Sequence, residues 1–241
     1  MSQPRTVRYG AEPSQVAELW LPSSAPKGVV VVIHGGFWRA RYDLSLGRPL
    51  TESLVGQGWA AWNIEYRRVG NGGGRVETVD DVAAAIDALA GQDLPLSRVL
   101  AVGHSAGGHL ATWAASRGRR ERRPAKVEVT GVVSQAGVLD LRAAYDEHLG
   151  DGAVEAFLGH RPGPDDDWLD PIRLVPLNVP VHCVHADGDD TVPIGQSRSY
   201  VATATAVGDR AELTEVAGDH YVVIDPESDA WRRTLEILED M

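Results

Sequence analysis

The sequence predicts an α/β protein in which a mostly parallel sheet of eight strands carries helices on both faces. The first observation is that short apolar runs, rich in valine, alternate along the chain with segments whose apolar residues recur at helical spacing. The second is the length of 241 residues, which suits one α/β domain with a large core. We therefore expect a single domain over residues 1–241.

The expected strands begin with an antiparallel hairpin formed by residues 6–9 and 16–21. The next run, Gly-Val-Val-Val-Val-Ile at 28–33, has no polar residue, which is typical of a strand buried on both faces. Further strands are expected where such runs recur, at residues 60–66, 98–102, 127–134, 181–185 and 211–216.

Helices are expected between these strands. In the segment 77–90 five apolar residues recur at helical spacing: Val79, Val82, Ala83, Ile86 and Leu89. Further helices are expected at residues 106–115, 197–206 and 229–239. Residues 140–176 break the alternation with turn-rich sequence, such as Pro-Gly-Pro-Asp-Asp-Asp at 162–167. We expect a small cap-like insertion there, with short helices over the carboxyl ends of the strands, where ligands gather in such sheets.

The heptapeptide Gly-His-Ser-Ala-Gly-Gly-His at 103–109 follows directly on an expected strand. Gly-x-Ser-x-Gly in this place indicates a nucleophile elbow, in which Ser105 takes a strained backbone conformation and glycine is needed at positions 103 and 107. The next helix presents its N–H groups and its dipole to the same spot. An idle serine in a glycine-rich turn is the alternative, which the flanking strand and helix disfavour. Ser105 is the predicted nucleophile.

A serine hydroxyl needs a base within hydrogen-bond reach and an acid that orients the base. In this architecture the chain order is serine, acid, histidine, each at the end of a strand. His220 follows the strand 211–216 and is the one histidine after the expected acid loop, so it is the predicted base. Three aspartates, Asp187, Asp189 and Asp190, share the loop after the strand 181–185, and spacing alone leaves the choice among them open.

The sequence His-Gly-Gly-Phe-Trp at 34–38 follows directly on the strand 28–33. Glycine in such a loop lets backbone N–H groups approach a substrate oxygen. We expect the N–H groups of Ala106, Gly36 and Phe37 to form the oxyanion hole for a tetrahedral intermediate. His34 is expected to hold this loop rather than to act as a base.

Composition and spacing exclude several classes of partner and cofactor. A net charge of −11 opposes binding to nucleic acid or to an anionic membrane, and the basic run 117–123 is interpreted as a solvated loop. No apolar stretch approaches a membrane span or a secretory segment, so we expect a cytoplasmic protein.

Cys183 is the only cysteine, so neither an internal disulfide nor a metal site with several cysteines can form. His182 and His185 stand three apart on a strand and point to opposite faces, and the aspartate loop lacks a calcium-binding pattern. No metal or other cofactor is expected.

The sequence resembles the α/β-hydrolase superfamily in three motifs: His34-Gly35-Gly36-Phe37-Trp38, Gly103-His104-Ser105-Ala106-Gly107-Gly108-His109-Leu110, and Asp189-Asp190-Thr191-Val192-Pro193 with Gln196-Ser197. More narrowly, it resembles the branch of kynurenine formamidases (arylformamidases) and related bacterial esterases and acyl-peptide hydrolases. The resemblance spans about residues 29–220. It implies the α/β-hydrolase fold, a cofactor-free hydrolase, and a catalytic triad of Ser105, Asp189 and His220, with Asp189 as the acid.

We therefore expect a serine hydrolase that cleaves small carboxylic esters or aryl formamides through an acyl-enzyme intermediate. One alternative is an acyl-peptide or prolyl-type peptidase, whose usual large extra domain has no room in this chain. Another is a non-catalytic ligand-binding protein, which a lost triad residue would indicate. Five aromatic residues either line an aromatic-accepting pocket or pack in the core: Phe37, Trp38, Tyr66, Tyr145 and Trp168. The sequence leaves open the physiological substrate, the oligomeric state and the shape of a glycine-rich rim at 72–74.

Overall fold

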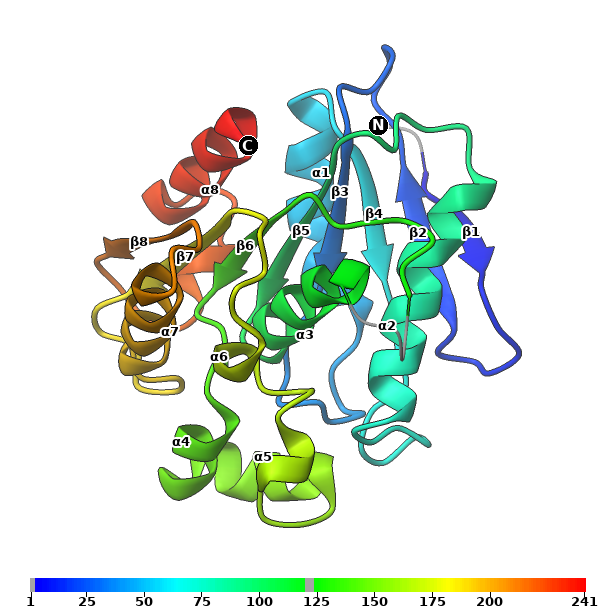
Figure 1. Cartoon of the computed structure of the whole chain (residues 1–241). Helices are drawn as coiled ribbons and strands as arrows, with labels where there is room; N and C mark the ends of the chain where they lie inside the picture. The colour runs from blue at the N-terminus through cyan, green and yellow to red at the C-terminus, as the bar shows by residue number, and fades with distance from the viewer. Residues whose placement is uncertain (1–2, 120–123) are drawn as a thin grey trace.

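A single sheet of eight strands organises the protein (Figure 1). The structure is a computed structural model that describes residues 3–119 and 124–241. The strands lie in the order β1-β2-β4-β3-β5-β6-β7-β8. β1 pairs with β2 and β2 with β4 in antiparallel fashion, while the other neighbours are parallel. The predicted mostly parallel sheet and its opening hairpin are therefore confirmed.

Every strand boundary lies within two residues of the predicted one, except the start of β6. Their bounds are β1 (Arg5–Arg8), β2 (Val16–Trp20), β3 (Val29–Ile33), β4 (Ala60–Ile64), β5 (Val99–His104), β6 (Gly131–Gln135), β7 (Val181–Ala186) and β8 (Ala211–Val216). The predicted start of β6, at residue 127, is wrong. Val127 and Val129 are buried, and the apolar pattern that they give to the sequence resembles that of a strand. Pairing with β5 nevertheless begins only at Gly131.

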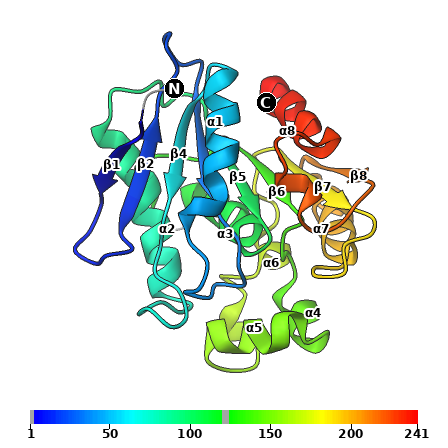
Figure 2. The same cartoon turned by 180° about the vertical axis from the view of Figure 1, so that it is seen from behind.

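Helices cover both faces of the sheet, as predicted (Figures 1 and 2). The larger ones are α1 (Arg48–Gly56), α2 (Glu77–Asp87), α3 (Ala106–Ala115), α7 (Gly195–Ala206) and α8 (Asp229–Asp240). α1 and α8 share one face, where the indole N–H of Trp231 donates to Ser53 Oγ at 2.8 Å. Helix α1 is absent from the predicted helices, although proline in the first turn and two buried leucines, Leu50 and Leu54, mark its start and inner face.

Two apolar clusters enclose the sheet, one on each face. Val29, Val31 and Ile33 of β3 enter one cluster, and Val30 and Val32 enter the other. Every residue of β3, β4 and β5 is buried. Because both faces are covered, these strands are mostly apolar rather than alternating, with Asn63 of β4 and His104 of β5 as buried polar residues.

Short helices occupy the segment 140–176: α4 (Leu141–Asp146), α5 (Leu149–Leu158) and α6 (Pro171–Leu174). α4 and α5 lie beyond one end of the sheet (Figure 1). Gly150, Asp151 and Gly152 interrupt α5 with left-handed backbone angles. The guanidinium of Arg39, which follows β3, donates to the carbonyl oxygen of Gly150. This bond joins the segment to the chain that follows β3, and Gly150 and Asp151 line the same cavity as Ser105.

Asp170 lies at the root of this segment and is 2% exposed. Its Oδ1 accepts the N–H of Leu141 at 3.0 Å, while its buried Oδ2 has no hydrogen-bond partner within the described residues. Burial raises the pKa of Asp170 to about 7. The folded state therefore favours the protonated carboxyl.

This burial predicts a pH-dependent stability that Asp170→Asn abolishes. Because the folded-state pKa is raised, the contribution of Asp170 is fully present below its ordinary pKa and is lost as the pH rises through about 7. Relative to Asp170→Asn, we expect the wild-type free energy of unfolding to fall by up to about 4 kcal/mol between pH 4 and pH 8. Urea unfolding at both pH values measures this. Asp146→Asn, at an exposed carboxyl, is the control, and equal pH dependence in all three proteins contradicts the prediction.

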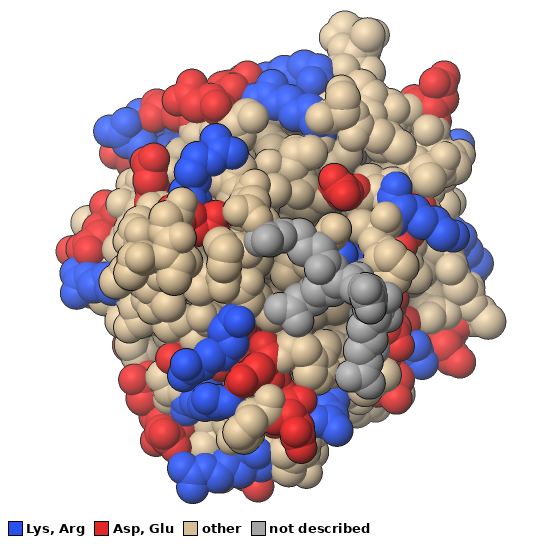
Figure 3. All heavy atoms as spheres, in the orientation of Figure 1, with Lys and Arg blue, Asp and Glu red and all other residues tan. Residues whose placement is uncertain are grey.

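The basic run 117–123 departs from its interpretation as a solvated loop. Residues 120–123 lie outside the described residues. Arg117 is 3% exposed, and its Nη2 lies 2.7 Å from Asp87 Oδ2, so it is part of the folded core rather than solvated. On the molecular face in Figure 3, basic and acidic side chains are interspersed. None of the helices in the two described ranges combines the length and apolarity that a membrane span requires.

Candidate active site

Ser105 is the single residue that connects β5, which ends at His104, to α3, which begins at Ala106. Its backbone angles, φ 56° and ψ −120°, are strained for a residue with a side chain. A Cβ at position 103 would lie 2.0 Å from the carbonyl oxygen of Gly107, and one at position 107 would lie 2.0 Å from that of Ile33. The strain and the two required glycines expected of a nucleophile elbow are both present.

His220 and Asp189 meet at the ends of β8 and β7. Nδ1 of His220 lies 2.7 Å from Asp189 Oδ2. The other oxygen, Oδ1, accepts the N–H groups of Thr191 at 2.9 Å and Val192 at 2.8 Å. These bonds fix the carboxylate, whose side chain is fully buried.

The two other aspartates of this loop are exposed, and neither contacts His220. Asp187 sits in the turn that follows β7, and Asp190 accepts a local bond from the hydroxyl of Thr191 at 3.3 Å. The geometry therefore distinguishes Asp189 among three residues that spacing alone leaves equal.

A second histidine, His185, also contacts this acid. Its Nε2 lies 3.3 Å from Asp189 Oδ2 and 2.8 Å from the carbonyl oxygen of Val192, while its Nδ1 lies 2.7 Å from Ser197 Oγ. Because Nε2 faces two acceptors, it carries the proton, and Nδ1 accepts from the Ser197 hydroxyl. From the sequence, His185 is considered only with His182 as a metal ligand. Its position at the carboxyl end of β7, four residues before Asp189, is the one signal for the contact.

Opposing effects act on the pKa of Asp189. Burial alone would raise it, but hydrogen bonds from His185, His220 and the N–H of Val192 outweigh the burial and hold the pKa well below its usual range. The carboxylate therefore stays ionised at neutral pH.

Ser105 and His220 line one cavity of about 260 Å³. Gly36 and Phe37, from the loop after β3, line it as well. Their N–H groups donate to no acceptor within the described ranges. Ala106 is the first residue of α3, where helix geometry leaves the N–H without an intrahelical acceptor. The structure thus brings the predicted nucleophile, base and loop donors to one place.

The loop after β3 is strained. Gly36, Phe37 and Trp38 have φ values of 108°, 51° and 54°, three left-handed residues in succession. Packing holds this conformation: Trp38 is fully buried and stacks on Phe157, with ring centroids 4.6 Å apart. Left-handed backbone at non-glycine residues costs about 1 to 3 kcal/mol each and persists where the surroundings enforce it. The left-handed conformation that this packing enforces places Gly36 and Phe37 at the cavity, which both residues line.

Two buried histidines support the site without charge. His34 stacks on Tyr66 at 4.5 Å, with its Nε2 3.0 Å from Glu65 Oε1, and burial lowers its pKa to about 3. His104 donates from Nε2 to the carbonyl oxygen of His220 at 2.9 Å, and burial followed by the proximity of His220 lowers its pKa to about 3. His34 holds the loop as expected. His104 occupies the first x position of Gly-x-Ser-x-Gly, and its bond to the main chain of His220 is not apparent from the sequence.

Of the five aromatic residues considered from the sequence, Phe37 is the one among the cavity-lining residues. Trp38 and Tyr66 are core residues, whereas Tyr42 and Tyr221 line the cavity in their place. The glycine-rich rim at 72–74 is not among the lining residues.

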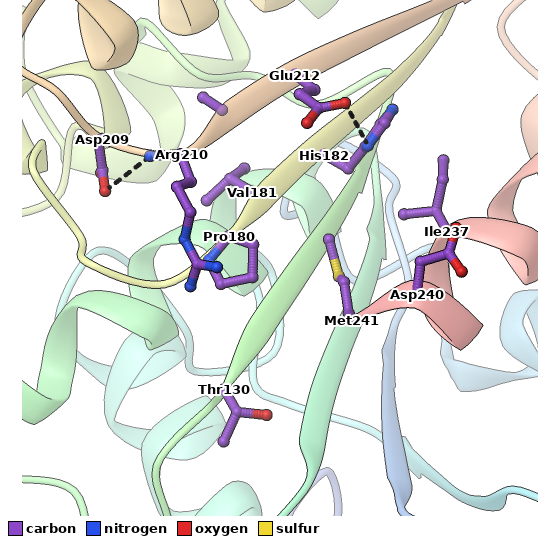
Figure 4. A pocket seen from close by; sticks show the side chains of 11 residues that line it. Thr130, Pro180, Val181, His182, Asp209, Arg210, Glu212, Ile237, Asp240 and Met241 are labelled. Atoms are coloured by element: carbon purple, nitrogen blue, oxygen red, sulfur yellow. Dashed lines mark hydrogen bonds and ion pairs between the residues drawn. The ribbon is translucent and has the colours of Figure 1, made fainter.

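A larger hollow, of about 520 Å³, lies at the opposite ends of β7 and β8 (Figure 4). Within it His182 lies 3.9 Å from Glu212 and its Nε2 lies 2.8 Å from Thr214 Oγ1, so it does not share a ligand with His185. Over the described ranges, no group of three or more His, Cys, Asp and Glu side chains is arranged to hold a metal ion. The hollow contains none of the predicted site residues.

Comparison with known proteins gives consistent matches. The BD-FAE family model matches residues 18–203. Esterase LipC of Mycobacterium tuberculosis is 27% identical over 224 residues, covering 84% of this chain and 55% of LipC, so the chain spans about half the length of that relative. Kynurenine formamidase of Danio rerio is 23% identical over 225 residues, covering 91% of this chain and 75% of that protein.

Solved structures show the same fold. Esterase B from Lactobacillus rhamnosis superimposes with a TM-score of 0.84 at 23% identity, over 98% of this chain and 84% of that chain. The α/β-hydrolase fold predicted from the three motifs is therefore confirmed.

Proposed function

The chain belongs to the BD-FAE family, and on this premise we propose that it is a serine hydrolase of small carboxylic esters or aryl formamides. The observation that carries the proposal is the strained Ser105, which lines one cavity with a histidine held at 2.7 Å by a buried carboxylate. The names of the relatives, an esterase and a formamidase, support the same chemistry. The cavity volume is near the lower end for small-molecule pockets, which favours a small substrate.

In the proposed acylation step, Ser105 Oγ attacks the carbonyl carbon while Nε2 of His220 accepts the hydroxyl proton. Asp189 holds Nδ1–H and stabilises the imidazolium. The N–H groups of Ala106, Gly36 and Phe37 would bind the oxyanion. His220 then donates its proton to the leaving alcohol or amine, and the acyl group remains on Ser105.

In the second step water replaces the leaving group. His220 takes a proton from the water, the hydroxide attacks the acyl carbon, and the acid departs as the proton returns to Ser105. The proposed cycle consumes only the substrate and one water molecule, and it involves no oxidation or reduction.

Covalent labelling tests this function directly. We expect the folded protein to react with a fluorophosphonate probe at Ser105, located by mass spectrometry, and to hydrolyse p-nitrophenyl esters or N-formylkynurenine. The relative kcat/KM of these substrates ranks esters against formamides. A folded protein that neither reacts with the probe nor turns over any of them would instead be a ligand-binding protein.

The proposed mechanism predicts a pH profile governed by one proton. Asp189 is already ionised, and the pKa values of His34 and His104, lowered to about 3 by burial, place their titration below the working range. We therefore expect log kcat/KM to rise with pH with a slope of one, because the proposed reaction requires one base in its unprotonated form. A slope of two would contradict the assignment. EDTA should have no effect, and loss of activity that zinc restores would replace the serine mechanism by metal-assisted hydrolysis.

A further inference from the structure

The cavity that holds Ser105 has an excess of positive charge in a protein whose net charge is −11. Apart from its histidines, its charged lining residues are Arg39, Arg41 and Asp151. The cavity lining therefore contains two guanidinium groups and only one carboxylate. The average surface repels an anion, so a local excess of positive charge at this one place needs a reason.

Neither cavity arginine forms an ion pair within the described part of the chain. Ten of the other described arginines pair with a carboxylate: Arg48, Arg67, Arg68, Arg75, Arg117, Arg142, Arg161, Arg198, Arg232 and Arg233. Carboxylates are abundant in this acidic chain. Among the described arginines, Arg5, Arg8, Arg98, Arg173 and Arg210 also form no ion pair, but only Arg39 and Arg41 line the cavity that holds Ser105.

Both guanidinium groups are held in place by uncharged groups. Arg39, half-buried, donates from Nη2 to the carbonyl oxygens of Gly150 and of Asp151, the latter at 3.3 Å. The guanidinium of Arg41 lies 4.6 Å from the centre of the Tyr42 ring and also contacts the Tyr42 hydroxyl. Carbonyl bonds and stacking orient a guanidinium without neutralising it, and most of its five N–H donors stay available.

We propose, building on the hydrolase function above, that the cavity selects substrates that carry a carboxylate near the scissile ester or amide, and that Arg41, assisted by Arg39, binds this carboxylate. A guanidinium offers two parallel N–H groups that match the two oxygens of a carboxylate. This contact forms when the substrate binds and persists in the transition state, so it acts mainly on KM.

A matched pair of esters tests the proposal: p-nitrophenyl valerate, which is neutral, and mono-p-nitrophenyl glutarate, which has the same acyl length and a terminal carboxylate. The measured quantity is the ratio of kcat/KM for the glutarate ester to that for the valerate ester, after subtraction of spontaneous hydrolysis. We expect Arg41→Gln to lower this ratio about tenfold, mostly through KM, and Arg41→Lys to retain a larger part of it. High salt should lower the wild-type ratio.

Arg8→Gln, at an exposed arginine on β1, is the matched control and should leave the ratio unchanged. A ratio that stays at the wild-type value in Arg41→Gln and in the double variant with Arg39→Gln, while valerate is still hydrolysed, overturns the carboxylate site and leaves the hydrolase function standing. Failure of the folded wild type to hydrolyse either ester overturns the carboxylate site, and the hydrolase function is overturned as well if the protein also fails to react with the fluorophosphonate probe and to hydrolyse N-formylkynurenine.

Discussion

Ser105→Ala is expected to leave a folded protein whose kcat is lower by about 10⁴ to 10⁶. The hydroxyl at the elbow supplies the covalent chemistry of the proposed mechanism, and alanine keeps the same Cβ in the strained backbone. What activity remains would come from the oxyanion donors and from binding alone. Steady-state turnover of a p-nitrophenyl ester measures the loss, and circular dichroism checks the fold.

Ser199→Ala, at an exposed serine of α7, is the control and should keep wild-type turnover and fluorophosphonate labelling. Retention of more than a tenth of wild-type turnover by Ser105→Ala would exclude this serine as the nucleophile.

Asp189→Asn is expected to lower kcat by about 10⁴. The asparagine can still accept the N–H bonds of Thr191 and Val192 through Oδ1, so the loop should persist. Its amide then faces Nδ1 of His220 in place of a carboxylate oxygen, which favours the wrong imidazole tautomer and leaves the imidazolium without its counter-charge.

Asp187→Asn and Asp190→Asn on the same loop are matched controls, because both side chains are exposed and neither contacts His220. They should each lower kcat by less than about tenfold. If either control lost more activity than Asp189→Asn, the acid would have to be reassigned to that residue.

The parts of the fold that the sequence predicts are those with a strong local pattern. β3 is apolar at every position because both of its faces are covered, and that pattern is visible without a structure. Helix α1 carries only weak signals, a proline in its first turn and leucines at positions 50 and 54, and these do not suffice to predict it. At Val127 and Val129 the sequence indicates burial correctly, but it does not show where pairing with β5 begins, so the predicted start of β6 is four residues too early.

The same distinction applies to the site. Ser105 lies in a motif whose glycines are required by local geometry, so a short stretch of sequence predicts its surroundings. The choice of Asp189 depends on which of three aspartates faces a loop about thirty residues away, and spacing alone does not determine this. The contacts of His185 with Asp189 and of Arg41 with Tyr42 join residues close in the chain, but they depend on side-chain orientation, which spacing does not show. The bond of His104 to His220 joins residues 116 positions apart, for which no local pattern exists.

The elbow and the loop after β3 meet through their main chains. A Cβ at position 107 would lie 2.0 Å from the carbonyl oxygen of Ile33, and one at position 35 would lie 2.7 Å from that of His104. The parallel pairing of β3 with β5 ends at Ile33 and Gly103, so main-chain hydrogen bonds set the spacing at the point where the loop and the elbow begin. Beyond that point side chains hold the loop, because Trp38 is fully buried and stacks on Phe157. Substitutions at this stack should therefore change the separation of Ser105 from the loop donors, and with it the activity per folded molecule, whereas loosening the core elsewhere should reduce stability first.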